Sequence, residues 1–273
     1  MTARRSPVAG RSHLAGRALD VYEALLSLGC EVFDAEKARF VRARSRPNVW
    51  DSNFVSHVRA DAPEETERLL ARAKREYAEA DKISFHCDYR TPPGFEAALA
   101  LDGYARDDAL LMLLEGEMQG QPAPADIRPV ESDEDWQAYE RLHLVDFAEY
   151  REKLSDKDMG WLAKEMMEAR RAASPPARFW MAYAEGEPRA YMTSWEGTEG
   201  VGQVEDLFTH PEYRHRGLAT ALIRHCVADA RAHGAGPVVI AADPTDTPKR
   251  MYAALGFRPL AMARSWRKEM ETA

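Results

Sequence analysis

The stretch VEDLFTHPEYRHRGLATALI, residues 204–223, decides the fold. It begins inside a predicted strand that runs from Val201 to about Thr209 and is closed by His210-Pro211-Glu212. A long helix follows, whose apolar residues recur with the period of one helical face: Ala219, Leu222, Ile223, Cys226, Val227 and Ala230. The segment between strand and helix is therefore placed at a helix N-terminus.

That segment, RHRGLA from Arg214 to Ala219, has the pattern Arg/Gln-x-x-Gly-x-Gly/Ala. Backbone N–H groups at a helix N-terminus are unpaired, and the helix dipole favours negative charge there. Gly217 and Ala219 are small enough for a pyrophosphate to approach the backbone, and Arg214 and Arg216 add donors that suit phosphate. The stretch is neither a GxxxxGK[ST] loop nor a GxGxxG fingerprint. It predicts a site for another phosphorylated cofactor.

Further elements are expected on both sides of this segment. Pro237 is followed by VVIAA, a continuous apolar run typical of a strand that is buried on both faces, as in a parallel pair. Period and turn residues predict strands at 126–130, 178–184 and 189–195, helices at 133–150, 156–172 and 249–255, and a closing strand or strand pair at 258–270.

These residues resemble a known family. The stretch 204–223 followed by MYAALGF, residues 251–257, is similar to the core of the GNAT superfamily of N-acetyltransferases; the likeness covers about 126–270. It implies an α/β fold around a mixed sheet, in which two parallel strands splay apart and acetyl-CoA, as co-substrate, lies in the gap. The resemblance also implies the cofactor-binding residues, which are Leu207, Phe208 and Thr209 beside the pantetheine arm and Arg214, His215, Arg216, Gly217, Leu218, Ala219 and Thr220 around the pyrophosphate.

Tyr252 stands four residues before Gly256, where family members carry a Tyr that protonates the leaving thiolate. An ordinary Tyr pKa of about 10 lies above that of a thiol, so the proton can be handed over. The alternative is a Tyr that only packs and hydrogen-bonds the sulfur. Thr245 replaces the Asn that many members have seven residues before the Tyr, which leaves the contacts to the pantetheine region open.

An amine nucleophile must also lose a proton, so a base is required. Glu205 and Asp206 lie on the strand that leads to the phosphate loop. Side chains alternate along a strand, so only one of them can face the cleft unless a bulge intervenes. Either could be the base or a substrate anchor, and His210 is a further candidate. We expect direct transfer, with a backbone amide near Leu207 stabilising the oxyanion and with no metal and no covalent enzyme intermediate.

The domain organisation follows from composition. GEMQGQPAPA, residues 116–125, is a linker between a domain at 18–115 and a catalytic GNAT domain at 126–273. Residues 1–17 hold four arginines and no acid, which predicts a flexible tail. The N-terminal half repeats part of the later order, with strands at 54–60 and 82–88 and helices at 62–80 and 94–101. It is expected to be a degenerate GNAT-like domain, which makes the arrangement a tandem one.

That half lacks a cofactor loop. Residues 57–70 contain no Gly and four acids, and Leu99 stands where Tyr252 stands later. Its expected role is to cover a sheet edge, to shape the acceptor cleft or to form a dimer contact, so a homodimer stays open.

Composition narrows the partners. Of 273 residues, 45% are hydrophobic and 30% charged, which is typical of globular proteins. The net charge of −8 argues against nucleic acid as the main partner. The sequence contains no run of 18 apolar residues, so no membrane span is predicted. Cys30, Cys87 and Cys226 form neither a disulfide framework nor a zinc site, which favours a reducing compartment such as the cytoplasm.

The sequence thus predicts an N-acetyltransferase that acts on a primary amine, most simply a small molecule. Two alternatives are a non-catalytic acyl-CoA sensor or regulatory protein, and an acetyltransferase that modifies proteins.

Overall fold

The computed structural model describes residues 7–121, 123–149 and 156–270. The N-terminal half holds, in chain order, α1 (Pro7–Leu26), β1 (Glu31–Ala35), β2 (Ala38–Arg42), η1 (Trp50–Ser52), β3 (Phe54–Ser56), α2 (Pro63–Glu76), β4 (Lys82–Cys87), α3 (Pro93–Leu101) and β5 (Ala105–Leu114). The C-terminal half holds β6 (Asp126–Pro129), α4 (Asp133–Ala148), α5 (Asp156–Ala173), β7 (Arg178–Ala184), β8 (Glu187–Thr198), β9 (Val201–Thr209), η3 (Pro211–Tyr213), α6 (Leu218–Ala232), β10 (Val238–Ala242), α7 (Pro248–Ala254) and β11 (Arg258–Glu269).

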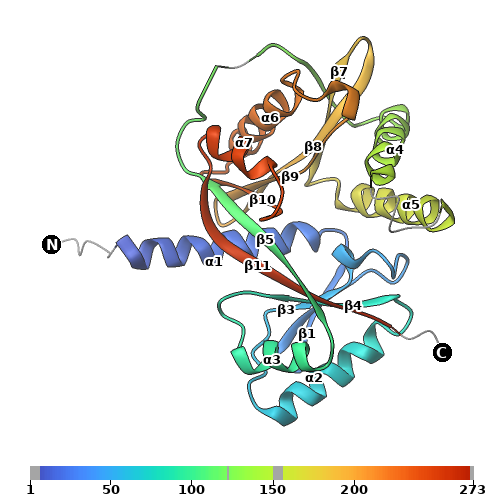
Figure 1. Cartoon of the computed structure of the whole chain (residues 1–273), viewed down its shortest axis with the longest axis vertical. Coiled ribbons are helices and arrows are strands. Elements are labelled where there is room, and N and C mark those ends of the chain that lie inside the picture. The colour runs from blue at the N-terminus through green and yellow to red at the C-terminus, as the bar shows by residue number, and fades with distance from the viewer. Residues whose placement is uncertain (1–6, 122, 150–155, 271–273) are drawn as a thin grey trace.

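All strands join one mixed sheet in the order β1-β2-β3-β4-β11-β5-β10-β9-β8-β7-β6 (Figure 1). The predicted α/β fold around a mixed sheet is confirmed. The pairs β9–β10 and β3–β4 are parallel, and the other neighbours are antiparallel. The predicted strands and helices of the C-terminal half appear within a few residues of their expected ends, and residues 258–269 form one strand.

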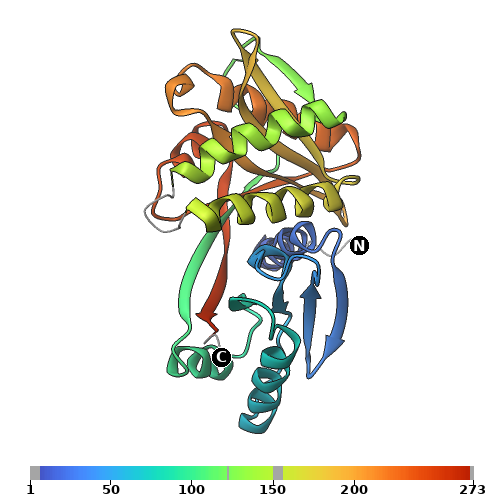
Figure 2. The same cartoon turned by 90° about the vertical axis from the view of Figure 1, so that its right-hand side faces the viewer.

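The two halves share strands. β5 comes from the N-terminal half but lies between β10 and β11, and β11 comes from the C-terminus but lies between β4 and β5. Figures 1 and 2 show β5 and β11 side by side as a ribbon that joins the upper and lower parts of the molecule. Sequence analysis did not predict β5, because ARDDALLMLL begins with charged residues and has no period of two over its first half.

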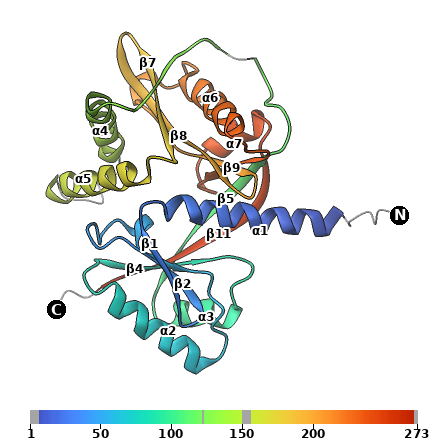
Figure 3. The same ribbon diagram turned by 180° about the vertical axis from the view of Figure 1, so that it is seen from behind.

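Helices cover both faces of the C-terminal part of the sheet. On one face, α6 and α7 pack over Met112, Met192, Val204 and Ile240. On the other face, α4 and α5 pack over Phe179 and Tyr191, and α1 packs over Leu111, Trp195 and Val239. Figure 3 shows α1 crossing the molecule between its upper and lower parts. No helix among the described residues is long and apolar enough to cross a membrane.

Helix α1 begins at Pro7, within the stretch for which a flexible tail was expected; residues 1–6 of that tail lie outside the described residues. The helix is held by tertiary packing, since Ala18, Leu19 and Val21 are fully buried against the sheet. Of its arginines, Arg11 is exposed and Arg17 lies 3.8 Å from a carboxylate oxygen of Glu199. The basic composition therefore marks the outer side of a packed helix.

Candidate active site

The predicted phosphate loop lies at the N-terminus of α6. Gly217 is the N-cap residue and has a left-handed backbone, with φ of 87°. A Cβ at this position would meet no atom within 4 Å, so the loop is open to solvent there. Among the described residues, none accepts a hydrogen bond from the amides of 215–220. The loop therefore offers a set of free N–H donors at the positive end of a helix dipole.

The two loop arginines are partly engaged by acids. The Arg214 guanidinium donates to both carboxylate oxygens of Glu149, at 2.7 and 2.6 Å, and to the Thr209 carbonyl oxygen at 3.1 Å. Arg216 is half-exposed, 3.8 Å from Glu185, and lies over the Tyr213 ring. Of the two side chains, Arg216 is therefore the one that can reach an anion without giving up a close ion pair.

The strands β9 and β10 splay apart, as the resemblance implied. They pair only at Val238 with Gly202 and at Val239 with Gln203. Beyond Gln203, the β9 backbone has no strand partner on this side within the described part of the chain. Leu207, Phe208 and Thr209 therefore present backbone groups to a gap into which an extended ligand can be added as a strand.

A β-bulge brings both predicted acids to one face. On β8, Thr193 pairs with Glu205 and Tyr191 pairs with Phe208, so β9 carries one extra residue. Asp206 takes up this residue with a φ of 58°. Glu205 lines the same cavity as Phe179, while Phe208 packs with Tyr191 in the cluster beneath α4 and α5. The strand alternation that would have separated Glu205 from Asp206 is broken here.

The pKa of Glu205 lies well above that of an ordinary carboxyl group. Burial, and then the charge of Asp206, raise its pKa to about 8. Hydrogen bonds from the Gln203 side chain, at 3.0 Å, and from the backbone amides of Asp206 and Ala241 act in the opposite direction. The Ala241 amide belongs to β10, so the Glu205 carboxylate lies at the point where the two strands part. A group that titrates near neutral pH at such a place suits general base catalysis.

Asp206 is held by Arg170, a residue that sequence analysis missed. The Arg170 Nη2 and Asp206 Oδ2 atoms are 3.1 Å apart, and the Arg170 side chain is 9% exposed. Arg170 also contacts His143 and lies over the Tyr139 ring. One signal was present, because Arg170 follows Leu162 and Met166 at helical spacing on the apolar side of α5. A charged residue in such a stripe needs a buried partner.

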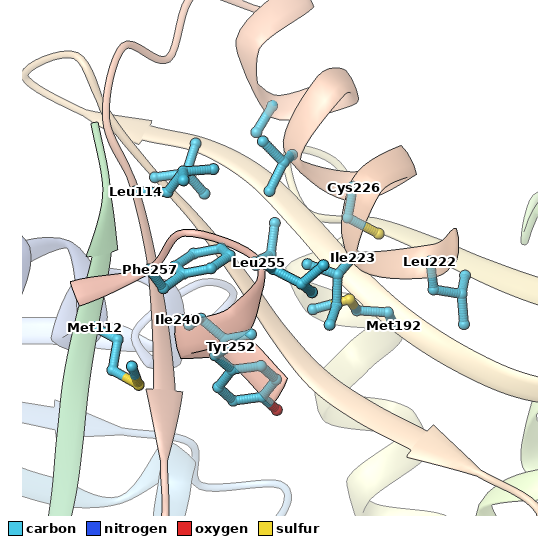
Figure 4. Close-up of a cluster of buried hydrophobic side chains, with 14 of the residues drawn as sticks. Met112, Leu114, Met192, Leu222, Ile223, Cys226, Ile240, Tyr252, Leu255 and Phe257 are labelled. Atoms are coloured by element: carbon cyan, nitrogen blue, oxygen red, sulfur yellow. The ribbon is translucent and has the colours of Figure 1, made fainter. Parts of the chain in front are cut away.

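Tyr252 lies in α7 within the core beneath α6. It is 5% exposed, and in Figure 4 its hydroxyl points away from the surrounding apolar side chains. Burial raises its pKa above the ordinary value, and the charges of Glu205 and Asp246 act in the same direction. The sensitivity to Glu205 places both groups in one electrostatic site. A raised pKa keeps the hydroxyl protonated, as an acid or a hydrogen-bond donor requires.

Thr245 lies in the exposed loop before α7. Its backbone amide and its hydroxyl both donate to Asp243 Oδ1, at 2.6 Å each. His210 accepts a hydrogen bond from the Glu212 amide through Nδ1, at 3.3 Å, and caps the short turn η3. His210 is thus engaged in local structure, and the bonds to Asp243 fix the Thr245 loop.

A cavity of about 90 Å³ adjoins the two acids. Its walls come from both halves of the chain, namely the end of α1, the turn η1, α5 and strands β7, β8 and β9. A second cavity of about 240 Å³ lies on another side of Glu205 and is bordered by Tyr22, Asp107, Asp108 and Asp243. None of the N-terminal residues in these walls was predicted, because nothing in the sequence shows which halves meet.

The corresponding place in the N-terminal half is closed to anions. At the start of α2, the Glu65 carboxylate accepts hydrogen bonds from the amides of Asp61 and Ala62, at 3.2 and 3.5 Å. Leu99, at the position matching Tyr252, is fully buried in the core of that half. The helix N-terminus is thus occupied by the chain's own carboxylate.

Comparisons with known proteins agree with this geometry. The acetyltransferase (GNAT) family matches residues 133–257. A GCN5-related N-acetyltransferase from Kribbella flavida is similar in structure, with a TM-score of 0.65, 17% identity and coverage of 94% of this chain and 95% of that one. A functionally unknown conserved protein from Staphylococcus epidermidis is also similar in structure, with a TM-score of 0.66 and 15% identity. The match covers 87% of this chain and 92% of that one.

A tandem GNAT protein from the clavulanic acid biosynthesis pathway has a TM-score of 0.58 at 15% identity, over 96% of each chain. The fold thus fits the predicted tandem arrangement. No curated protein matches the sequence significantly. The predicted resemblance is confirmed: the chain carries an acetyltransferase domain of the GNAT family at residues 133–257.

Proposed function

We propose that this acetyltransferase moves the acetyl group of acetyl-CoA directly to the primary amine of a small molecule. The observation that carries the proposal is Glu205, a carboxylate whose pKa is raised to about 8, at the point where β9 and β10 part. A base is needed there because an amine is protonated at neutral pH.

The residues present fit acetyl-CoA. The free amides of 215–220 and Arg216 suit a pyrophosphate, and the unpaired edge of β9 suits the amide groups of a pantetheine arm. Gly217 leaves open space where a side chain would stand. When bound, acetyl-CoA supplies an activated acetyl carbonyl as a thioester.

The chain's own residues account for the proton movements. The amine nitrogen forms a bond to the acetyl carbon, and the carbon–sulfur bond breaks. Glu205 accepts one proton of the ammonium, which frees the nitrogen lone pair for attack, and Tyr252 donates its hydroxyl proton to the departing sulfur. The second proton that the nitrogen loses on forming the amide returns to the Tyr252 oxygen. A backbone amide of β9 near Leu207 stabilises the charge on the carbonyl oxygen. Asp206, held by Arg170, lies beside the incoming ammonium.

The cavity argues for a small acceptor. At about 90 Å³, with walls from both halves, it admits a compact group and not a folded protein surface. A protein substrate would have to enter as an extended side chain.

Calorimetric titration with acetyl-CoA tests the cofactor site. We expect micromolar binding by the wild type and none by the Arg216→Glu, Gly217→Glu double variant, since two carboxylates would repel the pyrophosphate. Gly94→Glu is a matched control, because Gly94 also has open space around it but lies in the other half. Release of CoA only in the presence of an amine then distinguishes the transferase from a sensor. Absence of binding by the wild type would remove the proposal.

A further inference from the structure

The cavity beside Glu205 and Asp206 has an apolar body. Its apolar wall includes Leu25 and Leu28 from the end of α1 and the turn after it, Val49 before η1, Met166 and Ala169 from α5, and Phe179 from β7. Three of these six residues belong to the N-terminal half. Figure 2 shows the end of α1 and the turn that follows it close beneath α5. A ligand group in this cavity would contact apolar side chains from both halves of the chain.

The polar end of the cavity is lined by more acids than bases. Asp51, Glu205 and Asp206 line it, against Arg170 alone among basic residues. Arg170 is already paired with Asp206. A carboxylate entering this end would meet three carboxyl groups and a cation that is already paired, whereas an ammonium would meet hydrogen-bond acceptors on more than one side.

The cavity also holds an unused hydrogen-bonding group. Thr193 is 3% exposed, lines the cavity, and its hydroxyl has no partner among the described residues. It pairs with Glu205 across β8 and β9, so both side chains stand on one face of the sheet. A buried hydroxyl without a partner is costly, and an amine N–H beside Glu205 would satisfy it.

We infer that the acceptor is a small primary amine with a compact apolar side chain and no carboxylate, and that the N-terminal half selects it by forming one wall of its pocket. The inference rests on the proposed transferase function. The ammonium group lies at Glu205, Asp206 and Thr193, and the apolar side chain fills the space between α1, η1 and α5. A cavity of about 90 Å³ has room for several heavy atoms.

A panel of amines tests the substrate class, with kcat/KM measured by CoA release. Burial of each methylene is expected to raise kcat/KM roughly four-fold until the pocket is full. Butylamine should therefore exceed ethylamine by about an order of magnitude. The kcat/KM for 2-phenylethylamine should exceed that for phenylalanine, because phenylalanine adds a carboxylate. The kcat/KM for butylamine should exceed that for 1,4-diaminobutane, because the diamine places a second charge against the apolar wall.

Variants test the role of the N-terminal wall. Leu28→Ala enlarges the pocket and should move the preference toward longer amines through KM, with acetyl-CoA affinity unchanged. Val49→Trp fills the pocket and should lower kcat/KM for butylamine more than kcat/KM for ethylamine. Leu14→Ala, on helix α1 but outside the cavity, should leave the preference unchanged.

Two outcomes would overturn the inference. Preference for the diamine would place the acceptor in the cavity beside Asp107, Asp108 and Asp243. An unchanged preference in both wall variants would remove the N-terminal half from selection. If the proposed function itself were wrong, the result would be different: acetyl-CoA would not bind, or CoA would not be released with any amine of the panel.

Discussion

Replacing Glu205 with glutamine should stabilise the protein while removing its activity. The pKa of Glu205 is about 8 in the folded protein, against about 4.3 in an unfolded chain. Between these values, the folded protein holds a proton that the unfolded chain has lost. Each pH unit in this window therefore lowers the wild-type free energy of unfolding by about 1.4 kcal/mol through Glu205.

The glutamine of the Glu205→Gln variant cannot titrate, and its carbonyl oxygen can still accept the amide hydrogen bonds that Glu205 receives. The variant should match the wild type most closely near pH 4. The difference in its favour should widen by about 2.7 kcal/mol between pH 5.5 and 7.5. It should stop growing above pH 8, where Glu205 of the wild type is ionised in both the folded and the unfolded state.

Urea unfolding of both proteins at intervals of pH measures this difference, with exposed Glu187→Gln as the matched control. A stability difference that does not change with pH would refute the reasoning, because Glu205 would then have an ordinary pKa. The same pKa governs activity. Wild-type kcat/KM should rise by up to tenfold per pH unit below pH 8 and then stay constant. In the variant, kcat/KM should be roughly 10²–10⁴-fold lower and should no longer depend on pH in this way.

Three further predictions follow from the geometry. Tyr252→Phe should lower kcat by about two orders of magnitude with acetyl-CoA affinity unchanged by calorimetry, and full activity would remove Tyr252 as the acid. Gly197→Ala should cost at least about 2 kcal/mol in urea unfolding, because its Cβ would meet the Val201 carbonyl oxygen at 1.8 Å with φ at +72°. Gly186→Ala, with φ at +83° and open space, should cost only about 1 kcal/mol, and equal losses would contradict the clash. A fragment of residues 116–273 lacks β5 and should be unfolded by circular dichroism until residues 1–115 are co-expressed; a folded fragment would show that β5 is dispensable.

The elements around the phosphate loop could be predicted because their signals are local. The apolar stripe of α6 and the run VVIAA each report their own secondary structure. The exchange of β5 and β11 could not be predicted, because strand order depends on contacts between segments far apart in sequence. Arg267, for example, pairs with Ala105 across 162 positions, which no local pattern encodes.

The candidate site divides in the same way. The loop around Gly217 and the pair Glu205 and Asp206 can be recognised in the sequence. Which of the two acids faces the cleft depends on the β-bulge in β9, which the sequence does not reveal. Asp206 has no special sequence signal for its left-handed backbone, although aspartate tolerates it better than most residues. Arg170 was marked by its place in an apolar stripe, but its partner was not.

The place of β11 has a consequence for biosynthesis. This strand is synthesised after all the other strands of the sheet, yet it lies in the middle of the sheet, between β4 and β5. Until it arrives, both of those strands present unpaired edges, which are templates for aggregation. Neither half can complete its part of the sheet before these twelve residues of β11 are synthesised. A stop codon shortly before β11 would therefore leave both halves without a central strand.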